Sequence, residues 1–255
     1  MPAVKFKRIL LKLSGEYIAG KQGFGFCADV IDSLASQISE IHDLNVEIAI
    51  VIGGGNIFRG GNAKALKMER VTGDHIGMMA TLMNGLCMQD ALESKGKNTR
   101  LMSALTIPSV AEPYIKRRAI RHLEKKRIVI LGAGTGNPYL TTDTAAALRA
   151  MEINADIMIK GTMVDGVYDK DPLLNKDAVK FNTLNYQDVL INQLAVMDST
   201  AISFSRDNKL PLYVLNIGEQ RALLKFLLGE NNGTLVSDSP LEWLGINQNK
   251  NKTDA

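Results

Sequence analysis

Apolar residues follow two alternating patterns along this chain, short continuous runs and longer stretches at helical spacing. The runs are rich in β-branched side chains and end at glycine or polar residues, as buried parallel strands do. They predict strands at Arg8–Leu13, Val46–Ile52, Arg100–Leu105, Ile128–Leu131, Asp156–Lys160, Leu212–Leu215 and Thr234–Val236. The stretches between them predict helices near 30–44, Asp74–Leu92, Pro113–Lys126, Ala145–Met151, Tyr186–Val196, Ser199–Lys209 and Glu219–Leu228. This alternation predicts an α/β protein, a three-layer α/β/α sandwich around a mostly parallel sheet.

Two of these helices have unusual faces. The segment Asp74–Leu92 is apolar nearly all round, which is typical of a central core helix or of a subunit contact. Since other helices already cover the sheet, we favour the subunit contact. The helix Pro113–Lys126 should direct Ile115, Ile120 and Leu123 inward. Its outer face is basic, with Lys116, Arg117, Arg118, Arg121, Lys125 and Lys126. Such a face is more often solvated than bound to nucleic acid.

Composition narrows the class of protein. The chain has 255 residues, of which 45% are hydrophobic and 22% charged, as in ordinary globular proteins. A net charge of +3 is too small to argue for nucleic-acid binding. Apolar runs fall far short of the ~20 residues of a membrane span, and Cys27 and Cys87 form no disulfide framework or zinc spacing. We expect a cytoplasmic protein without a signal peptide, with one domain over residues 1–246 and a disordered tail at 247–255.

A glycine-rich loop follows the predicted strand Ile128–Leu131. It contains Gly132, Gly134 and Gly136 and the turn signal Asn137-Pro138, and it leads into helix-capping residue types at Thr141–Thr144. A strand, a glycine loop and a capped helix place backbone N–H groups and a positive helix end at the carboxyl edge of the sheet. Such an edge binds anions, phosphate above all.

Two common phosphate motifs do not fit. The dinucleotide fingerprint would need glycine where Asn137 stands. Gly15, Gly20 and Lys21 match part of a P-loop, but Gln22 replaces the hydroxyl residue that such a loop needs for Mg²⁺. The sequence therefore predicts a phosphate site of another kind.

Four predicted strand ends carry glycine or polar clusters, and ligands of open α/β sheets bind at this edge. The clusters are Lys12–Gly15, Gly53–Arg59, Gly132–Asp143 and Lys160–Thr162. Together they would bring Lys12, Arg59 and Lys160 around Asp143. Cations and backbone donors around negative charge are what phosphoryl transfer requires. Asp143 by itself would also fit a helix N-cap. Because Lys12 and Lys160 are predicted at neighbouring strand ends, we favour a role in which Asp143 positions the two lysines.

The general base is missing from these clusters. The three histidines, His42, His75 and His122, lie elsewhere in the sequence, and no metal-ligand cluster is recognisable. A kinase needs no base when its acceptor is already an anion. A phosphate monoester is largely doubly ionised at pH 7 because its second pKa is about 6. A carboxylate acceptor would serve equally well, so both acceptors stay open at this point.

The motifs also carry a resemblance. They are LKLSGE at Leu11–Glu16, VIGGGNIFRG at Val51–Gly60, GDHIGMMATLM at Gly73–Met83, GTGNPYLTTDT at Gly134–Thr144 and VDGVYDKDP at Val164–Pro172. From about Lys7 to Val236 the chain resembles the bacterial-type uridylate (UMP) kinases of the amino acid kinase family. The resemblance implies the amino acid kinase-like fold, with an acceptor-binding half over about 1–155 and an ATP-binding half over 156–246. It also implies transfer of a phosphoryl group from MgATP to UMP in pyrimidine nucleotide biosynthesis, with Mg²⁺ carried by ATP and no metal site on the protein.

The resemblance implies roles for individual residues. The catalytic set is Lys12, Arg59, Asp143 and Lys160, with Asp143 holding the two lysines. The implied ATP set is Lys12, Leu13, Ser14, Gly15, Gly55, Arg59, Thr162, Tyr168 and Asp171. The implied UMP set is Gly54, Asp74, Thr135, Gly136, Asn137, Pro138, Tyr139, Leu140, Thr141 and Thr142. Tyr168 would equally fit a packing role.

Regulation and assembly are implied as well. Relatives form homohexamers, are activated by GTP and are inhibited by UTP. The GTP region corresponds to Gln22, Gly23, Phe24, Gly25, Phe26 and Cys27. Many relatives have Ile-Asp where this chain has Phe26-Cys27, and the missing carboxylate weakens the expectation of GTP activation. Gly132 and Gly161 are milder departures that remove no reacting group.

Two rival functions remain. One is phosphorylation of a carboxylate such as acetylglutamate or aspartate, against which Asp74 and the loop Thr135–Thr142 indicate nucleoside recognition. The other is a nucleotide-sensing regulatory protein that binds DNA through the basic face of Lys116–Lys126. The intact Lys12, Asp143 and Lys160 argue against this second function.

Overall fold

A large sheet runs through the middle of the molecule. The structure, a computed structural model, describes residues 4–59 and 65–239, so the predicted tail at 247–255 lies outside the described residues. Within them, nine strands form the order β4-β3-β5-β2-β1-β6-β10-β11-β9. Every neighbouring pair is parallel except β10 and β11. The strands are β1 (Arg8–Leu13), β2 (Glu47–Ile52), β3 (Thr99–Ser103), β4 (Glu112–Pro113), β5 (Ile128–Gly132), β6 (Ile157–Thr162), β9 (Thr183–Leu184), β10 (Leu212–Asn216) and β11 (Gly233–Val236).

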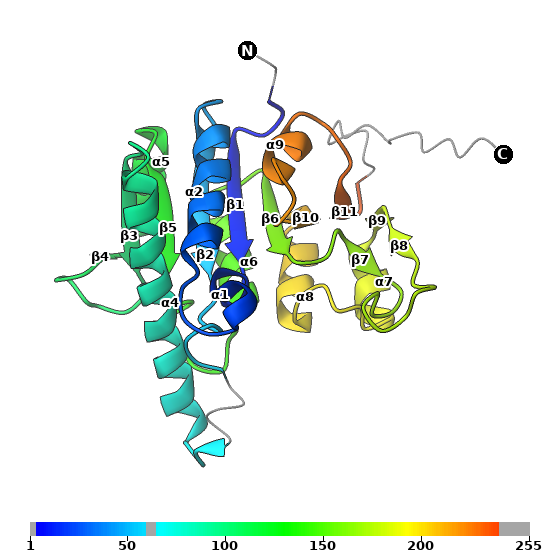
Figure 1. Cartoon of the computed structure of the whole chain (residues 1–255), viewed down its shortest axis with the longest axis horizontal. Coiled ribbons are helices and arrows are strands. Elements are labelled where there is room, and N and C mark those ends of the chain that lie inside the picture. Colours follow the sequence, from blue (N-terminus) through cyan, green and yellow to red (C-terminus); the bar gives the residue numbers. More distant parts are fainter. Residues whose placement is uncertain (1–3, 60–64, 240–255) are drawn as a thin grey trace.

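Helices cover both faces of the sheet, which confirms the predicted three-layer fold (Figure 1). One face packs against α1 (Gly15–Ala19), α2 (Ala28–His42), α4 (Arg70–Glu93) and α9 (Ala222–Leu227), with the short 3-10 helix η1 (Gly20–Gln22) after α1. The other packs against α5 (Lys116–Glu124), α6 (Thr142–Glu152), α7 (Tyr186–Ile191) and α8 (Ser199–Asp207). None of the helices in the described ranges combines the length and apolarity that crossing a membrane requires.

The alternation of side chains along β1 decides where the site forms. Ile9, Leu11 and Leu13 belong to the core on the α2 and α4 side, whereas Leu10 belongs to the core on the α6 side. Successive strand residues point to opposite faces, so Lys12 follows Leu10 towards α6. Lys160 on the neighbouring strand β6 is the ladder partner of Lys12 and points to the same side. Both lysines thereby point towards the N-terminus of α6.

Helix α4 differs from the other helices in its outer surface. It is 24 residues long, and Figure 1 shows its N-terminal part, in cyan, reaching beyond the sheet. Met79, Met83 and Leu86 are 45%, 48% and 41% exposed on its outer side. An exposed apolar stripe is typical of a surface that binds another protein chain. The subunit contact expected here stays a prediction.

The helix expected at Pro113 begins later. Pro113 belongs to β4 and pairs with Ser103 of β3, whose carbonyl also accepts a hydrogen bond from the Tyr114 N–H at 2.8 Å. The chain stays extended while this ladder lasts, so α5 begins only at Lys116. Ile115 is consequently exposed rather than inward. The predicted basic outer face is confirmed, because Lys116, Arg117, Arg118, Arg121, Lys125 and Lys126 are all exposed.

The dipeptide Asp165-Gly166, whose type is typical of a two-residue hairpin turn, does not join two paired strands here. Two further strands, β7 (Val167–Tyr168) and β8 (Lys180–Phe181), pair as an antiparallel ribbon, but residues 169–179 join them. Asp165 accepts hydrogen bonds from Tyr168 Oη at 2.6 Å and Lys180 Nζ at 2.9 Å. Its carboxylate therefore connects β7 to β8 through hydrogen bonds, and the two strands are not joined by a two-residue turn.

Helix α7 is shorter than predicted. It ends at Ile191, whereas the sequence predicts a helix to Val196.

Candidate active site

Two lysines and one aspartate form the charged centre of the site. Lys12 on β1 and Lys160 on β6 are direct partners in the parallel ladder. Asp143, in the first turn of α6, lies between them. Its Oδ1 forms an ion pair with Lys12 Nζ, and its Oδ2 lies 2.9 Å from Lys160 Nζ. The structure thus brings together three of the four predicted catalytic side chains.

Burial and charge act against each other in this triad. Burial would raise the pKa of Asp143, but the charges of Lys12 and Lys160 outweigh it and hold the pKa below its ordinary value. For Lys160, burial lowers the pKa, and the charge of Asp143 only partly restores it. Asp143 therefore stays ionised at neutral pH. Lys160 loses its proton at a lower pH than an ordinary lysine does.

Helix α6 begins in a way that fixes Asp143. Thr141 is the N-cap, and its hydroxyl accepts hydrogen bonds from the N–H groups of Asp143 and Thr144, both at 3.1 Å. Asp143 is therefore not the cap, and its carboxylate is free for the lysines. Asp198, the N-cap of α8, also accepts hydrogen bonds from the hydroxyls of Thr141 and Thr144. The starts of α6 and α8 are tied together at the charged centre.

The loop between α7 and α8 supports the second lysine. The carbonyl of Val196 accepts a hydrogen bond from Lys160 Nζ. The negative charge of nearby Asp198 also acts on Lys160 and raises its pKa slightly against the effect of burial. Lys160 Nζ is therefore held by two groups from different elements, the Val196 carbonyl and the Asp143 carboxylate.

The glycine loop after β5 adopts left-handed backbone conformations at four positions. Ala133, Gly134, Gly136 and Tyr139 all have positive φ angles, at 62°, 58°, 80° and 70°. Non-glycine residues seldom adopt this region and do so mostly where the surroundings enforce it. Here the N–H of Ala133 donates to the hydroxyl of Thr81 on α4 at 2.8 Å. The loop is therefore anchored to α4 at its start.

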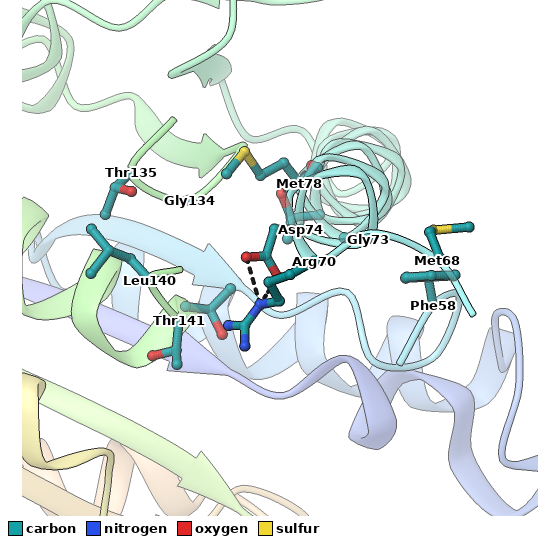
Figure 2. Close-up of a pocket in the computed structure, with 13 residues that line it drawn as sticks. Phe58, Met68, Arg70, Gly73, Asp74, Met78, Gly134, Thr135, Leu140 and Thr141 are labelled. Carbon is teal, nitrogen blue, oxygen red and sulfur yellow. Dashed lines mark hydrogen bonds and ion pairs between the residues drawn. The ribbon is translucent and has the colours of Figure 1, made fainter. Parts of the chain in front are cut away.

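A cavity of about 640 Å³ lies between this loop and α4. Figure 2 shows Thr135, Leu140 and Thr141 on one side, with Asp74 and Arg70 from α4 facing them. Thr142 also lines the cavity. Five of the predicted UMP residues therefore line it: Asp74, Thr135, Leu140, Thr141 and Thr142. The remaining lining residues are Phe58, Met68, Gly73, Gly77, Met78, Thr81 and Gly134.

Asp74 already has two partners in this structure. Its carboxylate accepts hydrogen bonds from Arg70 Nε at 2.8 and 2.9 Å and from the N–H of Tyr139 at 2.7 Å. Asp74 therefore bridges α4 to the glycine loop across the cavity. Tyr139 itself is 66% exposed, with Arg70 5.6 Å from the centre of its ring. Gly136, Asn137, Pro138 and Tyr139 do not line the described cavity.

The loop after β2 supplies the other predicted phosphate contacts. Gly54 packs so tightly on α4 that an added Cβ would lie 2.8 Å from the Cβ of Ala80. Arg59, with 55% of its side chain exposed, donates to the Gly55 carbonyl at 3.2 Å and lies 3.5 Å from Glu16. Its guanidinium therefore contacts the loop after β2 and Glu16, and the ion pairs of the Lys12, Asp143 and Lys160 cluster do not include it.

The predicted ATP residues fall into two groups. Ser14 caps α1 and, with Leu13 and Gly15, lies at the end of β1 beside the lysines. Thr162 ends β6, where its hydroxyl donates to the Val164 carbonyl at 2.7 Å. Tyr168 is bound to Asp165 rather than packed in a core, and this hydrogen bond is the main cause that raises the pKa of Tyr168 to about 12. Asp171 is exposed, and its carboxylate accepts the N–H of Leu173 at 2.8 Å.

Comparisons with known proteins show the family of this chain. The model of the amino acid kinase family matches residues 7–216. The chain belongs to the amino acid kinase family. Within it, a uridylate kinase from Roseobacter denitrificans is 53% identical over 237 residues, which cover 93% of this chain and 98% of that protein.

Solved structures of family members show the same fold. The UMP kinase from Bacillus anthracis has a TM-score of 0.90 and 42% identity, covering 92% of this chain and 97% of that one. The UMP kinase from Ureaplasma parvum has a TM-score of 0.87 and 37% identity, covering 91% and 99%. The resemblance to this family and its fold, predicted from the motifs, is confirmed.

Several residues of the site were not predicted from the sequence. Asp198 and the Val196 carbonyl support the charged centre, and Arg70 holds Asp74. The stretch Met197-Asp198-Ser199 does carry a helix-start signal, because aspartate is a preferred N-cap. Nothing local, however, indicates that this cap would face α6.

Proposed function

We propose that this protein is a UMP kinase that transfers the γ-phosphoryl group of MgATP to UMP and forms ADP and UDP. The observation that carries the proposal is the position of the Lys12, Asp143 and Lys160 cluster beside the cavity of about 640 Å³. The cavity is walled by Asp74 and by the two ends of the loop after β5, Gly134-Thr135 and Leu140–Thr142, and its volume suits a small-molecule substrate. The uridylate and UMP kinases among its relatives support the choice of acceptor.

The proposed reaction proceeds without a general base. The phosphate of UMP is mostly a dianion at pH 7, and one of its oxygens attacks the γ-phosphorus of ATP while the bond to the β-phosphate oxygen breaks. Lys12 and Lys160 would neutralise charge on the phosphoryl group as it passes between the two oxygens. Asp143 would keep both ammonium groups in position before the substrates arrive, so little reorganisation is needed in the transition state.

The remaining proposed roles are those that the resemblance implies. Ser14 and Gly15 at the end of β1 would bind the ATP phosphates, with Thr162, Tyr168 and Asp171 around the base and sugar. Gly54 and Arg59 would contact the UMP phosphate or the transferred group, and Asp74 would accept a ribose hydroxyl. Asp74 accepts three hydrogen bonds, from Arg70 and from the Tyr139 N–H, and a carboxylate has about four acceptor sites, so a ribose hydroxyl can be added to them.

Magnesium enters this reaction as part of its substrate. Among residues 4–59 and 65–239, no three His, Cys, Asp or Glu side chains converge to hold a metal ion. Mg²⁺ bound to the ATP phosphates would offset their charge during transfer. We further propose a homohexamer assembled in part through the Met79, Met83 and Leu86 face of α4, located in the cytoplasm. GTP and UTP are proposed as effectors, with GTP activation weakened by the absence of a carboxylate at Phe26-Cys27.

The test is turnover of MgATP with UMP, CMP and acetylglutamate in parallel, each with and without GTP. We expect UDP from UMP and little product from the other two acceptors. Product from acetylglutamate alone would overturn the roles of Asp74 and the glycine loop while leaving the fold unaffected. Absence of turnover, together with salt-sensitive DNA binding through the basic face of α5, would favour the regulatory function instead.

A further inference from the structure

Two asparagine side chains, which the mechanism above does not use, are fully buried beneath the phosphate loops. Asn56 follows β2 and is 1% exposed, and Asn84 lies on α4 and is 0% exposed. Their amides pair head to tail: Asn84 Nδ2 donates to Asn56 Oδ1 at 2.7 Å, and Asn56 Nδ2 donates to Asn84 Oδ1 at 2.9 Å. We call these two residues the amide pair.

Each amide uses its second N–H to hold a backbone carbonyl. Asn84 Nδ2 also donates to the Gly53 carbonyl at 2.6 Å, and Asn56 Nδ2 donates to the Gly25 carbonyl at 2.8 Å. The N–H of Gly25 returns a bond of 2.9 Å to the backbone carbonyl of Asn56. Rotating either side-chain amide by 180° would exchange its oxygen and nitrogen and place Oδ1 next to a backbone carbonyl oxygen. The hydrogen bonds therefore fix one orientation of each amide.

The amide pair also touches the loop at the end of β1. A Cβ added to Gly15 would lie 2.5 Å from Asn56 Oδ1, 2.6 Å from the Gly53 carbonyl oxygen and 2.7 Å from the Gly55 backbone nitrogen. The Gly53 N–H in turn donates to the Leu13 carbonyl at 2.9 Å. One buried amide pair therefore lies under both the loop after β1 and the loop after β2.

We infer that Asn84, through Asn56, is a positioning residue for phosphoryl transfer, fixing the donor and acceptor phosphate loops relative to each other. This inference rests on the proposed function, in which Gly15 binds the ATP phosphates and Gly54 contacts the UMP phosphate or the transferred group. Reacting oxygens must be held at near-contact distance and in line, and a displacement of about 1 Å can lower the rate by on the order of 100-fold. An apolar residue at position 84 would suit the core side of α4, but it could not set this distance.

The test compares Asn84→Leu and Asn84→Ser with the wild type. Leucine has the branched shape of asparagine, although it is larger, and it removes the amide partner of the Gly53 carbonyl and of Asn56 Oδ1. Asn56 Nδ2 would keep only its bond to the Gly25 carbonyl. Serine is smaller and leaves space for water, so it serves as the milder variant. We expect kcat/KM for both substrates to fall by on the order of 100-fold in Asn84→Leu and by less in Asn84→Ser.

The matched control is Tyr186→Phe. This change removes one buried hydrogen bond, from Tyr186 Oη to the Leu210 carbonyl, at the opposite edge of the sheet. It should lower the melting temperature but leave kcat and both KM values unchanged. A purely structural role for Asn84 would give the same result as this control.

The outcomes are separable by measurement. All assays are run below the melting temperature found by circular dichroism, and Asn84→Ser decides the question if Asn84→Leu does not fold. Wild-type kcat and KM values in a folded Asn84 variant would overturn the inference. If the wild type does not phosphorylate UMP, the substrate assignment has failed. ATP binding by calorimetry then tests the amide pair, and an affinity unchanged by Asn84→Ser would overturn it.

Discussion

Replacing Asp143 by asparagine tests the charged centre most directly, because the two side chains have nearly the same shape. The change removes the shared partner of two buried ammonium groups, Lys12 and Lys160, whose side chains are 8% and 17% exposed. Removing one partner of a buried ion pair lowers the free energy of unfolding by about 3–5 kcal/mol. Since domains of this size are typically stable by about 5–15 kcal/mol, we expect the variant to fold at 25 °C but to unfold at lower urea concentration.

The effect on catalysis should be larger in kcat than in KM. Asp143 contacts the lysines and does not line the cavity, so ground-state binding of UMP should change little. The lysines, without their carboxylate, would no longer be held where charge develops. Loss of one preorganised electrostatic group lowers kcat by about 10²–10³-fold, which corresponds to about 2.7–4 kcal/mol. Steady-state kinetics with UMP varied at saturating MgATP measures both constants.

The matched control lies at the other end of the same strand. Arg8 and Glu47 form an equally buried ion pair, 2.7 Å long with side chains 12% and 4% exposed. Glu47→Gln should destabilise the protein to a similar extent in urea unfolding and leave kcat intact. A normal kcat in Asp143→Asn would remove Asp143 from the mechanism. An equal loss of kcat in Glu47→Gln would mean that destabilisation, not charge organisation, explains the effect.

Three further changes have defined outcomes. Arg59→Lys keeps the charge but loses the planar fork that binds phosphate oxygens, so kcat/KM for UMP should fall, and an unchanged value would exclude a bidentate contact. The pKa of Lys160 is lowered by burial and partly restored by Asp143, so kcat should fall as pH rises through that pKa; Asp143→Asn should move this alkaline limb to lower pH, and a shift to higher pH would contradict the assignment. Gly132→Ala would place a Cβ 2.5 Å from Leu82 Cδ2 and should destabilise by about 1–3 kcal/mol, a loss that Leu82→Val should partly restore in thermal unfolding.

Much of the fold could be predicted from periodicity because most strands are buried on both faces. Such strands appear as continuous apolar runs, and their carboxyl ends share one edge of the sheet. This rule predicts that Lys12 and Lys160 lie close together, and the two residues are direct partners across β1 and β6. Element boundaries do not follow from periodicity, because tertiary pairing decides them. Pro113 stays in a strand only because β3 lies beside it.

Partners from distant elements could not be read from the sequence. Asp198 meets Thr144 across 54 residues, and Asn84 meets Asn56 across 28. One signal for Asn84 was nevertheless available. Thr81, Asn84 and Met88 follow helical spacing on α4 and are all buried. A polar residue on a buried stripe requires a hydrogen-bond partner, so the pattern indicates a buried contact without identifying it.

The charges at the centre do not cancel, and this imbalance bears on function. Lys12 and Lys160 carry two positive charges, and Asp143 supplies one negative charge within ion-pair distance. The pKa of Lys160 is lowered by burial, which indicates that the surroundings oppose its charge. The Val196 carbonyl accepts a hydrogen bond from Lys160, and the negative charge of Asp198 raises the Lys160 pKa, but this pKa stays below its ordinary value. Under the proposed function, an arriving phosphate group would supply the missing negative charge, so substrate binding would stabilise the two cations. The two ammonium groups would then favour catalysis by stabilising the charge on the transferred group and its leaving oxygen more in the transition state than in the bound substrates.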